Sequence, residues 1–458
     1  MFQYLIKRLA FAIPTWLVIS VVIFNLSQCT SGDAVGEKLR NNADSNTGGR
    51  ISDAQYAETA HDLGLDKPTF YATLLPAAFP DTFYKILRRD ERQALEQLIW
   101  QYGNWSTIAD FHNEMVCFLS KISQSTEGGA FQNNTQQLLI QSSDSTIVYH
   151  LKKLEQLADT TRFKTDVAKI VSAYTNIKQN PRRGQLYIPR FHWFGVDNQY
   201  HFWLTHFLKG DFGFSKTDQS VAEKLKSPLS ITLVLSLFSI LLAYIIGVPL
   251  GVFVATNRHT RLGKWVVRGI FAIYSVPTFW LATLAAMFLT TRFYGLKIFP
   301  DVGLANDIPI GATIWQTLAY SAGHLILPIL CLSVHPITVI ARHTQGAVVE
   351  VLEKDYIKTA RAKGLSQRRI VWHHAVRNAL TPLITLLGAL IPAMITGAFA
   401  IELVFSLHGM GTAVVEAIFA KDWSVVFAVL MLVSFVILLS NLLVDVLYWL
   451  SNPRVRFS

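Results

Sequence analysis

Residues 229–255 read LSITLVLSLFSILLAYIIGVPLGVFVA, and no side chain in this stretch is charged. A helix needs about 20 predominantly apolar residues to cross the hydrocarbon core of a bilayer. This stretch is longer than that, and its apolar residues run continuously instead of marking one helical face. It therefore predicts a membrane-spanning helix.

Five further stretches have the same character. Hydrophobic residues make up 51% of the 458 residues and charged residues only 16%, and the apolar residues are concentrated in runs. The other predicted spans cover residues 9–28, 266–290, 322–341, 383–405 and 424–450. We therefore predict an all-α polytopic membrane protein with six transmembrane helices.

The basic residues predict the orientation of these spans, because Lys and Arg in short loops stay on the cytoplasmic side. Lys7 and Arg8 precede the first span, residues 258–268 between the second and third carry four basic side chains, and residues 354–377 between the fourth and fifth are strongly basic. An even number of spans places both termini on one side. Both termini are therefore predicted to be cytoplasmic, and much of the net charge of +10 follows from this topology rather than from binding nucleic acid.

The segment between the first two spans is too long and too polar for a loop, so residues 29–228 are predicted to form a large helix-rich external domain. Residues 84–103, YKILRRDERQALEQLIWQYG, repeat apolar side chains three and four positions apart, as amphipathic helices do. The histidines of this segment are scattered, and no two stand four apart on a helix. Neither a metal site nor catalytic chemistry is expected there.

An aromatic stretch, YIPRFHWFGVDNQYHFWL, lies at residues 187–204. Amphipathic aromatic rings are typical of the headgroup level of a bilayer, which favours an interfacial belt. The alternative is an aromatic patch that binds a peptide.

Residues 344–382 form a basic loop between the fourth and fifth spans. A first helix is predicted to end at Gly364, since glycine readily takes the left-handed conformation that closes helices. Ser366 is placed to cap a second helix that stops before Pro382. The first helix is predicted to be built on Val348, Leu352, Tyr356 and Ala360, and the second on Ile370, Val371, Ala375 and Ala379. Contact with anionic lipid explains the charge, whereas the small residues of the turn favour docking in a groove on a partner.

This loop also carries a family resemblance. Residues 355–384, DYIKTARAKGLSQRRIVWHHAVRNALTPLI, resemble the coupling segment of permease subunits in binding-protein-dependent ABC importers of the dipeptide, oligopeptide and nickel group. Four other segments resemble the same family, in the same order along the chain: MFQYLIKRLAFAIPTWLVIS at 1–20, HLILPILCLSV at 324–334, IELVFSLHGMGTAVVEAIFAKDW at 401–423 and NLLVDVLYWLSNPRVR at 441–456.

The resemblance implies a function and a set of partners. It implies a permease subunit of the bacterial inner membrane that moves peptides or a related small solute. The implied partners are a homologous second permease, two ABC ATPase subunits, an external solute-binding protein and the lipid bilayer, with no nucleic acid. No cofactor is expected on this chain, since ATP and Mg²⁺ would be bound by the partner subunits. The residues implied to contact an ATPase are Asp355, Tyr356, Ile357, Thr359, Ala360, Arg361, Ala362, Gly364 and Leu365.

The chain itself is not predicted to be an enzyme. It contains no G-x-x-x-x-G-K-[ST] phosphate loop, and RLGKWV at residues 261–266 has the Gly-Lys pair without the earlier glycine or the following hydroxyl residue. ATP hydrolysis is therefore expected in separate subunits.

The same resemblance divides the chain. Residues 1–28 would form the N-terminus and first span, and residues 229–458 a permease core of five helices. LGLDKP at 63–68 and GDFGFS at 210–215 resemble two segments that relatives carry close together, which implies an inserted helical module at about 71–192. Lys358, Thr359 and Ala360 stand where the general importer motif has Glu-Ala-Ala.

Three polar residues in the predicted spans are candidates for the translocation path, because ionisable groups at membrane depth are usually functional. They are Glu402, Asn441 and Asp445. Hydrogen bonding between helices is the alternative for both carboxylates. For the whole chain, the alternative to a permease is a membrane-anchored receptor or scaffold whose external helical domain binds a ligand.

Overall fold

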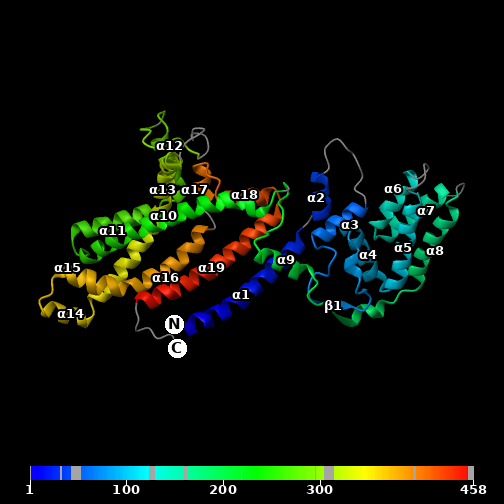
Figure 1. Ribbon diagram of the computed structural model, residues 1–458, viewed down its shortest axis with the longest axis horizontal. Helices are drawn as coiled ribbons and strands as arrows, with labels where there is room; N and C mark the ends of the chain where they lie inside the picture. The colour runs from blue at the N-terminus through cyan, green and yellow to red at the C-terminus, as the bar shows by residue number, and fades with distance from the viewer. Residues whose placement is uncertain are drawn as a thin grey trace. The chain divides into compact units, whose positions relative to one another are not determined.

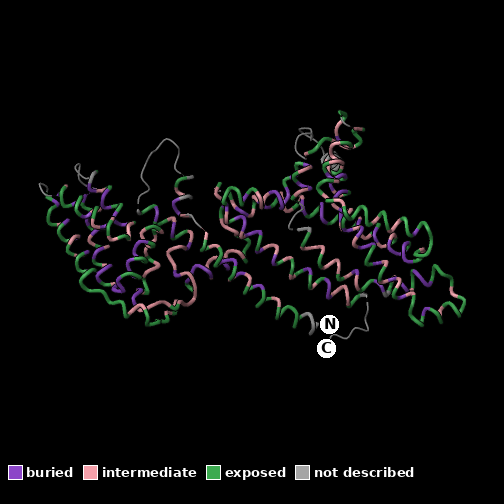
Figure 2. Tube along the Cα trace, turned by 180° about the vertical axis from the view of Figure 1, so that it is seen from behind, coloured by how far each residue is buried: buried purple, intermediate pink, exposed green. Residues whose placement is uncertain are grey.

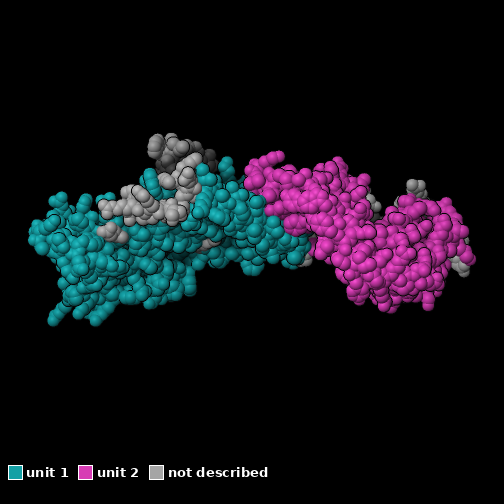
Figure 3. All heavy atoms as spheres, turned by 90° about the horizontal axis from the view of Figure 1, so that it is seen from below, with its two compact units in different colours: residues 1–30, 211–458 teal, residues 31–210 magenta. Residues whose placement is uncertain are grey.

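The computed structural model describes residues 2–30, 33–42, 53–122, 129–158, 162–217, 219–293, 295–303, 314–395 and 399–451. The chain divides into two compact units, coloured separately in Figure 3. We call residues 1–30 with 211–458 the membrane unit, and residues 31–210 the helical unit.

Four helices of the membrane unit, within its described residues, are long and apolar enough to cross a bilayer. They are α1 (Phe2–Cys29), α10 (Val221–Thr256), α13 (Ile314–Leu352) and α19 (Trp423–Ser451). In Figure 1, α1 runs beside α19, which it contacts. Four of the six predicted spans thus correspond to single helices of sufficient apolar length.

The span predicted at 266–290 is bent, and a second bent helix pair overlaps the start of the span predicted at 383–405. Helix α11 (Arg261–Tyr274) meets α12 (Thr278–Thr290) at 92° across a break that contains Pro277. Proline has no N–H to donate and disfavours a helical conformation of the residue before it, so the break falls there. Residues 367–375 and 379–393 meet at 48°. The described residues thus provide four candidate spans, or up to six if each bent pair is one, and the span predicted at 266–290 is interrupted.

The remaining helical elements of the membrane unit are shorter or belong to the second bent pair. They are α14 (Asp355–Ala362), α15 (Gln367–Arg369), the π-helical turn η3 (Ile370–Ala375), α16 (Val376–Ile395), α17 (Phe399–Val404) and α18 (Met410–Phe419).

Small residues form the seam between α10 and α13. Ala243, Gly247, Gly251 and Ala255 stand four residues apart on α10 and are all buried. A Cβ at Gly251 would lie 2.4 Å from the backbone oxygen of Ala341 on α13. Helices in membranes associate by such close backbone approach, because lipid provides no hydrophobic drive between them.

We expect Gly251→Ala to destabilise the protein, since α10 and α13 must separate to admit the new methyl group. Overpacking of this kind costs about 1–3 kcal/mol. Gly269→Ala in α11 is the control, because no described atom lies within 4 Å of its Cβ position. Thermal unfolding in detergent should show a lower midpoint for Gly251→Ala alone, and equal midpoints for the two variants would contradict the close seam.

The helical unit is built around five amphipathic helices, α4 (Arg89–Tyr102), α5 (Trp105–Ile122), α6 (Gly129–Leu139), α7 (Asp144–Ala158) and α8 (Lys164–Gln179). Figure 2 shows buried residues lining the space between these helices. The predicted period holds within α4, where Ala94, Leu95, Leu98 and Ile99 are all buried, but the helix begins at Arg89 and not at residue 84. The other elements are α2 (Ala34–Asn42), α3 (Asp53–Asp62), η1 (Phe83–Lys85), η2 (Arg183–Tyr187) and α9 (Gln199–Leu208).

A polar cluster ties three of these helices together at Asp144. One carboxylate oxygen accepts hydrogen bonds from the hydroxyls of Tyr102 and Tyr174 at 2.7 and 2.6 Å, and Lys178 pairs with the other at 3.1 Å. Partial burial acts to raise the pKa of Asp144, but the two tyrosine hydrogen bonds and the lysine outweigh it, so the pKa is lowered. Burial, followed by the bond to Asp144, raises the pKa of Tyr102 to about 12.

Two strands that were not predicted form a ribbon in the helical unit. β1 (Ala72–Pro76) pairs antiparallel with β2 (Pro189–Trp193), with Leu74 opposite Phe191. The ribbon lies at the two ends of the range in which an insertion is predicted, so the chain enters and leaves the helices α4–α8 through paired strands.

The second half of the aromatic stretch packs inside the helical unit. Tyr200 in α9 is 4% exposed, with its ring 5.4 Å from that of Phe70. The Nδ1 atom of His201 lies 3.1 Å from the hydroxyl oxygen of Tyr71. These residues therefore stabilise the helical unit itself. The prediction of a contact with the membrane interface then applies only to the first half of the stretch.

Candidate functional site

The predicted contact segment is a short helix, α14, exposed on nearly every side. Ile357 is its one fully buried residue, at 0% exposed, whereas Asp355, Tyr356, Thr359, Arg361 and Ala362 are exposed. Ala360 and Leu365 are half-buried. The helix thus presents both charged and small side chains on its outer surface.

The end of α14 is closed by Gly364. This residue has φ +74°, the left-handed conformation that glycine adopts at little cost. Its N–H donates to the carbonyl of Arg361 at 3.0 Å, and the N–H of Leu365 donates to the carbonyl of Ala360 at 3.3 Å. This pair of bonds is the Schellman motif, so the sequence prediction for Gly364 is confirmed.

The helix before Gly364 was predicted incorrectly in one respect. We expected one helix built on Val348, Leu352, Tyr356 and Ala360, but α13 ends at Leu352 and α14 begins at Asp355. The interruption turns the chain, so the buried residue is Ile357 and Tyr356 is 48% exposed. A continuous helical period cannot be extended across such a break.

The helix after Gly364 also differs from the prediction. Ser366 stands at the N-cap position of α15, yet its side chain makes no capping hydrogen bond to the described residues. The predicted end before Pro382 is wrong, because α16 continues through Pro382 to Ile395. The proline is tolerated where the chain bends by 48° and a π-helical turn precedes it.

Ile357 joins α14 to the spans. It is buried in a cluster that contains residues of α10, α13, η3 and α16: Val252, Ala255, Val348, Val351, Ile370, Val371, Ala375 and Ala379. An ion pair of 2.8 Å between Arg258 and Glu353 links the end of α10 to the end of α13. A displacement of α14 would therefore shift the packing of α10, α13 and α16, since a close-packed cluster does not deform continuously.

Glu402 lies in α17 and is 1% exposed. Its carboxylate oxygens accept from the Thr232 hydroxyl of α10 at 3.0 Å and from the N–H of Thr412 in the first turn of α18 at 2.9 Å. A Cβ at Gly409 would lie 2.3 Å from Oε1 of Glu402, so a larger residue there would displace the carboxylate. These contacts support the inter-helix alternative for Glu402.

Asp445 and Asn441 lie on α19 in different surroundings. Asp445 is 8% exposed, and its carboxylate lies 3.3 Å from the guanidinium Nε of Arg8 on α1. Asn441, one turn earlier, is exposed on the surface of α19. Glu402 and Asp445 therefore belong to separate networks, and of the three candidates only Asn441 presents its side chain on an open surface.

One buried charged group was missed from the sequence. Asp422, 2% exposed, accepts a hydrogen bond from Ser215 and pairs with Lys224 at 2.9 Å. Ser215 ends the GDFGFS segment, and Asp422 lies in the family-like segment 401–423. Both segments resemble the same family, and this was the one sequence signal that could have suggested a contact between them. The contact is long-range, and no local sequence pattern indicates it.

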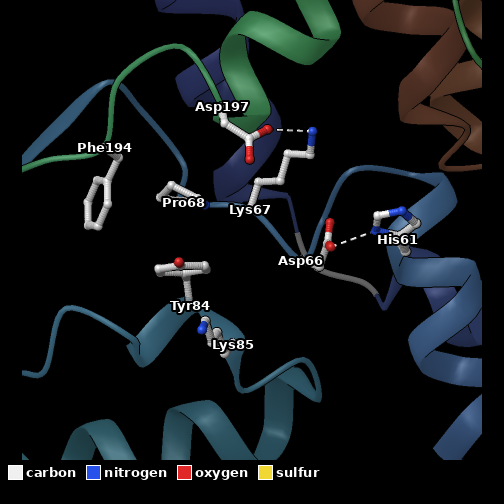
Figure 4. Close-up of a pocket in the computed structure, with 8 residues that line it drawn as sticks. All are labelled: His61, Asp66, Lys67, Pro68, Tyr84, Lys85, Phe194 and Asp197. Carbon is white, nitrogen blue, oxygen red and sulfur yellow. Dashed lines mark hydrogen bonds and ion pairs between the residues drawn. The ribbon is translucent and has the colours of Figure 1, made fainter.

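The helical unit contains a pocket of about 300 Å³, shown in Figure 4. Two ion pairs line this pocket: His61 pairs with Asp66 at 2.7 Å, and Lys67 pairs with Asp197 at 2.6 Å. The hydrogen bond to Asp66 raises the pKa of His61. These pairs hold the LGLDKP segment to α3 and to the start of α9, which is a structural role.

Comparison with known proteins gives consistent matches. A family model described as "Binding-protein-dependent transport system inner membrane component" matches residues 247–457. The dipeptide permease DppB of Bacillus subtilis is 37% identical over 260 residues, covering 56% of this chain and 79% of that protein. The di/tripeptide permease DppB of Pseudomonas aeruginosa is 34% identical over 287 residues, covering 59% and 85%.

An oligopeptide permease and one solved structure also match the chain. The oligopeptide permease OppB of Mycobacterium tuberculosis is 32% identical over 289 residues, covering 62% of this chain and 89% of that protein. A solved structure of the MetNI methionine ABC transporter, in an inward-facing conformation, covers 49% of this chain and 94% of its own at 19% identity and a TM-score of 0.38. The family model's range includes α14, Gly364, Glu402 and Asp445.

Proposed function

Because the chain belongs to the family of binding-protein-dependent transport inner membrane components, and within it to the peptide ABC importer permeases, we propose that it forms one half of a peptide-conducting pore with a second permease. The pore is driven by ATP hydrolysis in two separate ATPase subunits, and an external solute-binding protein delivers the peptide. In this arrangement both termini and α14 face the cytoplasm.

The observation that carries the proposal is the way in which α14 is attached to the membrane helices. A helix that exposes almost all of its surface while one residue, Ile357, is fully buried among three spans is suited to transmit a push from outside the membrane. ATPase subunits that approach each other would move α14 as a rigid body and tilt α10, α13 and α16 with it. The pore would then alternate between two states biased by a partner bound elsewhere.

The residues of this chain have distinct parts in that coupling. Gly364 sets the direction in which α14 projects, Ala360 and Ala362 allow close approach, and Arg361 is exposed to meet acidic groups of the partner. ATP and Mg²⁺ would be held by the partner subunits, because this chain has no phosphate-binding loop.

A cross-linking experiment tests the docking surface. In a background without the three native cysteines, Ala362→Cys should cross-link to a co-expressed ATPase subunit, because Ala362 is exposed at the end of α14. Ser227→Cys is the control, since Ser227 is also exposed but lies at the opposite end of α10 from Val252 and Ala255, which pack in one cluster with Ile357. Cross-linking at both positions, or at Ser227 alone, would contradict the proposal.

The same preparation separates a permease from a scaffold. Reconstituted with its second permease, ATPases and binding protein, the chain should support ATP-dependent uptake of labelled di- and oligopeptides. A membrane-anchored receptor would instead bind peptide to the helical unit alone, with neither cross-link nor uptake.

A further inference from the structure

One face of the β1–β2 ribbon is apolar and uncovered. Opposed residues of an antiparallel pair point to the same side, so Leu74, Phe191 and Trp193 share one face. Their exposed fractions are 70%, 64% and 68%. Tyr187 and Val196, just outside the strands, are 85% and 67% exposed. Exposed apolar side chains gathered in this way mark an interaction surface.

The exposure of this face is fixed by the packing of the opposite one. Leu75, which points the other way, packs against the core of α4–α8, and His192 is half-buried. The ribbon cannot rotate to bury its apolar face without giving up that contact, because a strand's side chains alternate between its two faces.

The charge around the ribbon favours an anionic partner. Arg182 and Arg183, in the segment before β2, are exposed, whereas Arg190, opposite Leu75, belongs to the other face of the ribbon. The acidic neighbours are Asp81 and Asp197, and Asp197 pairs with Lys67 at 2.6 Å. Apolar and aromatic side chains flanked by arginine form the pattern of surfaces that lie in the headgroup region of an anionic bilayer.

The chain connects the helical unit to the membrane unit at both of its ends. The helical unit is joined at residue 30 to α1 and at residue 211 to the segment before α10. Both α1 and α10 are candidate spans. The link from Gly210 to Val221 reaches at most about 40 Å when fully extended. Tethering at both ends gives weak surface contacts a high effective concentration.

We propose that the ribbon face of Leu74, Phe191 and Trp193 inserts into the headgroup layer of the membrane, with Arg182 and Arg183 contacting anionic phospholipid. The helical unit would then be held against the bilayer by a third point besides its two chain connections. This inference depends only on the chain being a membrane protein and is independent of what it transports.

A spin-label experiment on the full-length chain tests the proposal. In the cysteine-free background, a nitroxide at Leu74→Cys is compared with one at Tyr149→Cys in α7, which is similarly exposed at 61%. The chain is placed in nanodiscs of equal parts phosphatidylcholine and phosphatidylglycerol, in which both membrane faces are open to solutes. The ratio of oxygen to nickel-chelate collision rates should be several-fold higher at position 74, because lipid admits oxygen and excludes the chelate. Equal ratios at the two positions would overturn the proposal.

Charge variants test the lipid chemistry. Arg182→Glu should lower the ratio at position 74 in the anionic nanodiscs, whereas Lys152→Glu, the same charge change at an exposed site on α7, should not. An unchanged ratio in Arg182→Glu would overturn the anionic contact. Protection at position 74 that requires the second permease or a solute-binding protein would mean that a protein covers this face, which also overturns the proposal. Matched thermal unfolding midpoints confirm that all variants fold.

Discussion

Gly364→Val is expected to abolish ATPase association and peptide uptake while leaving the protein folded. At φ +74° a β-branched side chain costs about 1–3 kcal/mol, and the Schellman bonds that end α14 give way to another backbone conformation. No described atom lies within 4 Å of the Cβ position, so the effect comes from the backbone and not from a clash. Co-purification of the ATPase and uptake in proteoliposomes measure the loss.

Gly364→Asn separates the conformation of this residue from its identity. Asparagine tolerates the left-handed region better than any β-branched residue, so this variant should keep most of both activities despite its larger side chain. If valine and asparagine reduced association equally, the small size of the residue would matter and not the turn. If neither reduced it, α14 would not be the docking site.

The features that the sequence predicted well are those set by local chemistry. Apolar length identified the segments that become α1, α10, α13 and α19, because a span depends only on its own composition. Gly364 was placed at a helix end because a left-handed residue there is a property of the turn itself. Amphipathic spacing likewise found the buried face of α4.

The features that it missed depend on residues far apart in the chain. The pairing of β1 with β2 joins residues more than a hundred positions apart, and five residues of either strand alone give no clear signal. The contacts Arg8 with Asp445 and Lys224 with Asp422 bring together helices whose neighbours cannot be read from hydropathy. Tyr356 was wrongly placed on the apolar face of a continuous helix, because a two-residue interruption after α13 resets the helical phase.

Glu402→Ala is expected to destabilise the membrane unit strongly. The carboxylate bridges α10 and α18, and its removal leaves the Thr232 hydroxyl and the Thr412 N–H buried without this acceptor. Each buried group left unsatisfied costs about 1–3 kcal/mol, so the total is about 2–6 kcal/mol. The midpoint of thermal unfolding in detergent and the yield of monodisperse protein measure the loss. Glu416→Ala, on the exposed side of α18, is the matched control and should be neutral.

Glu402→Gln then distinguishes a bridge between helices from a residue of the translocation path. The amide keeps the shape of the side chain and one acceptor oxygen, so it should recover part of the lost stability. Because the contacts of Glu402 are to a hydroxyl and a backbone N–H rather than to open space, uptake per folded transporter should remain near that of the unaltered protein. A glutamine variant that is fully stable yet transports no peptide would place the charge of Glu402 in the path itself, and the inter-helix role would then be secondary.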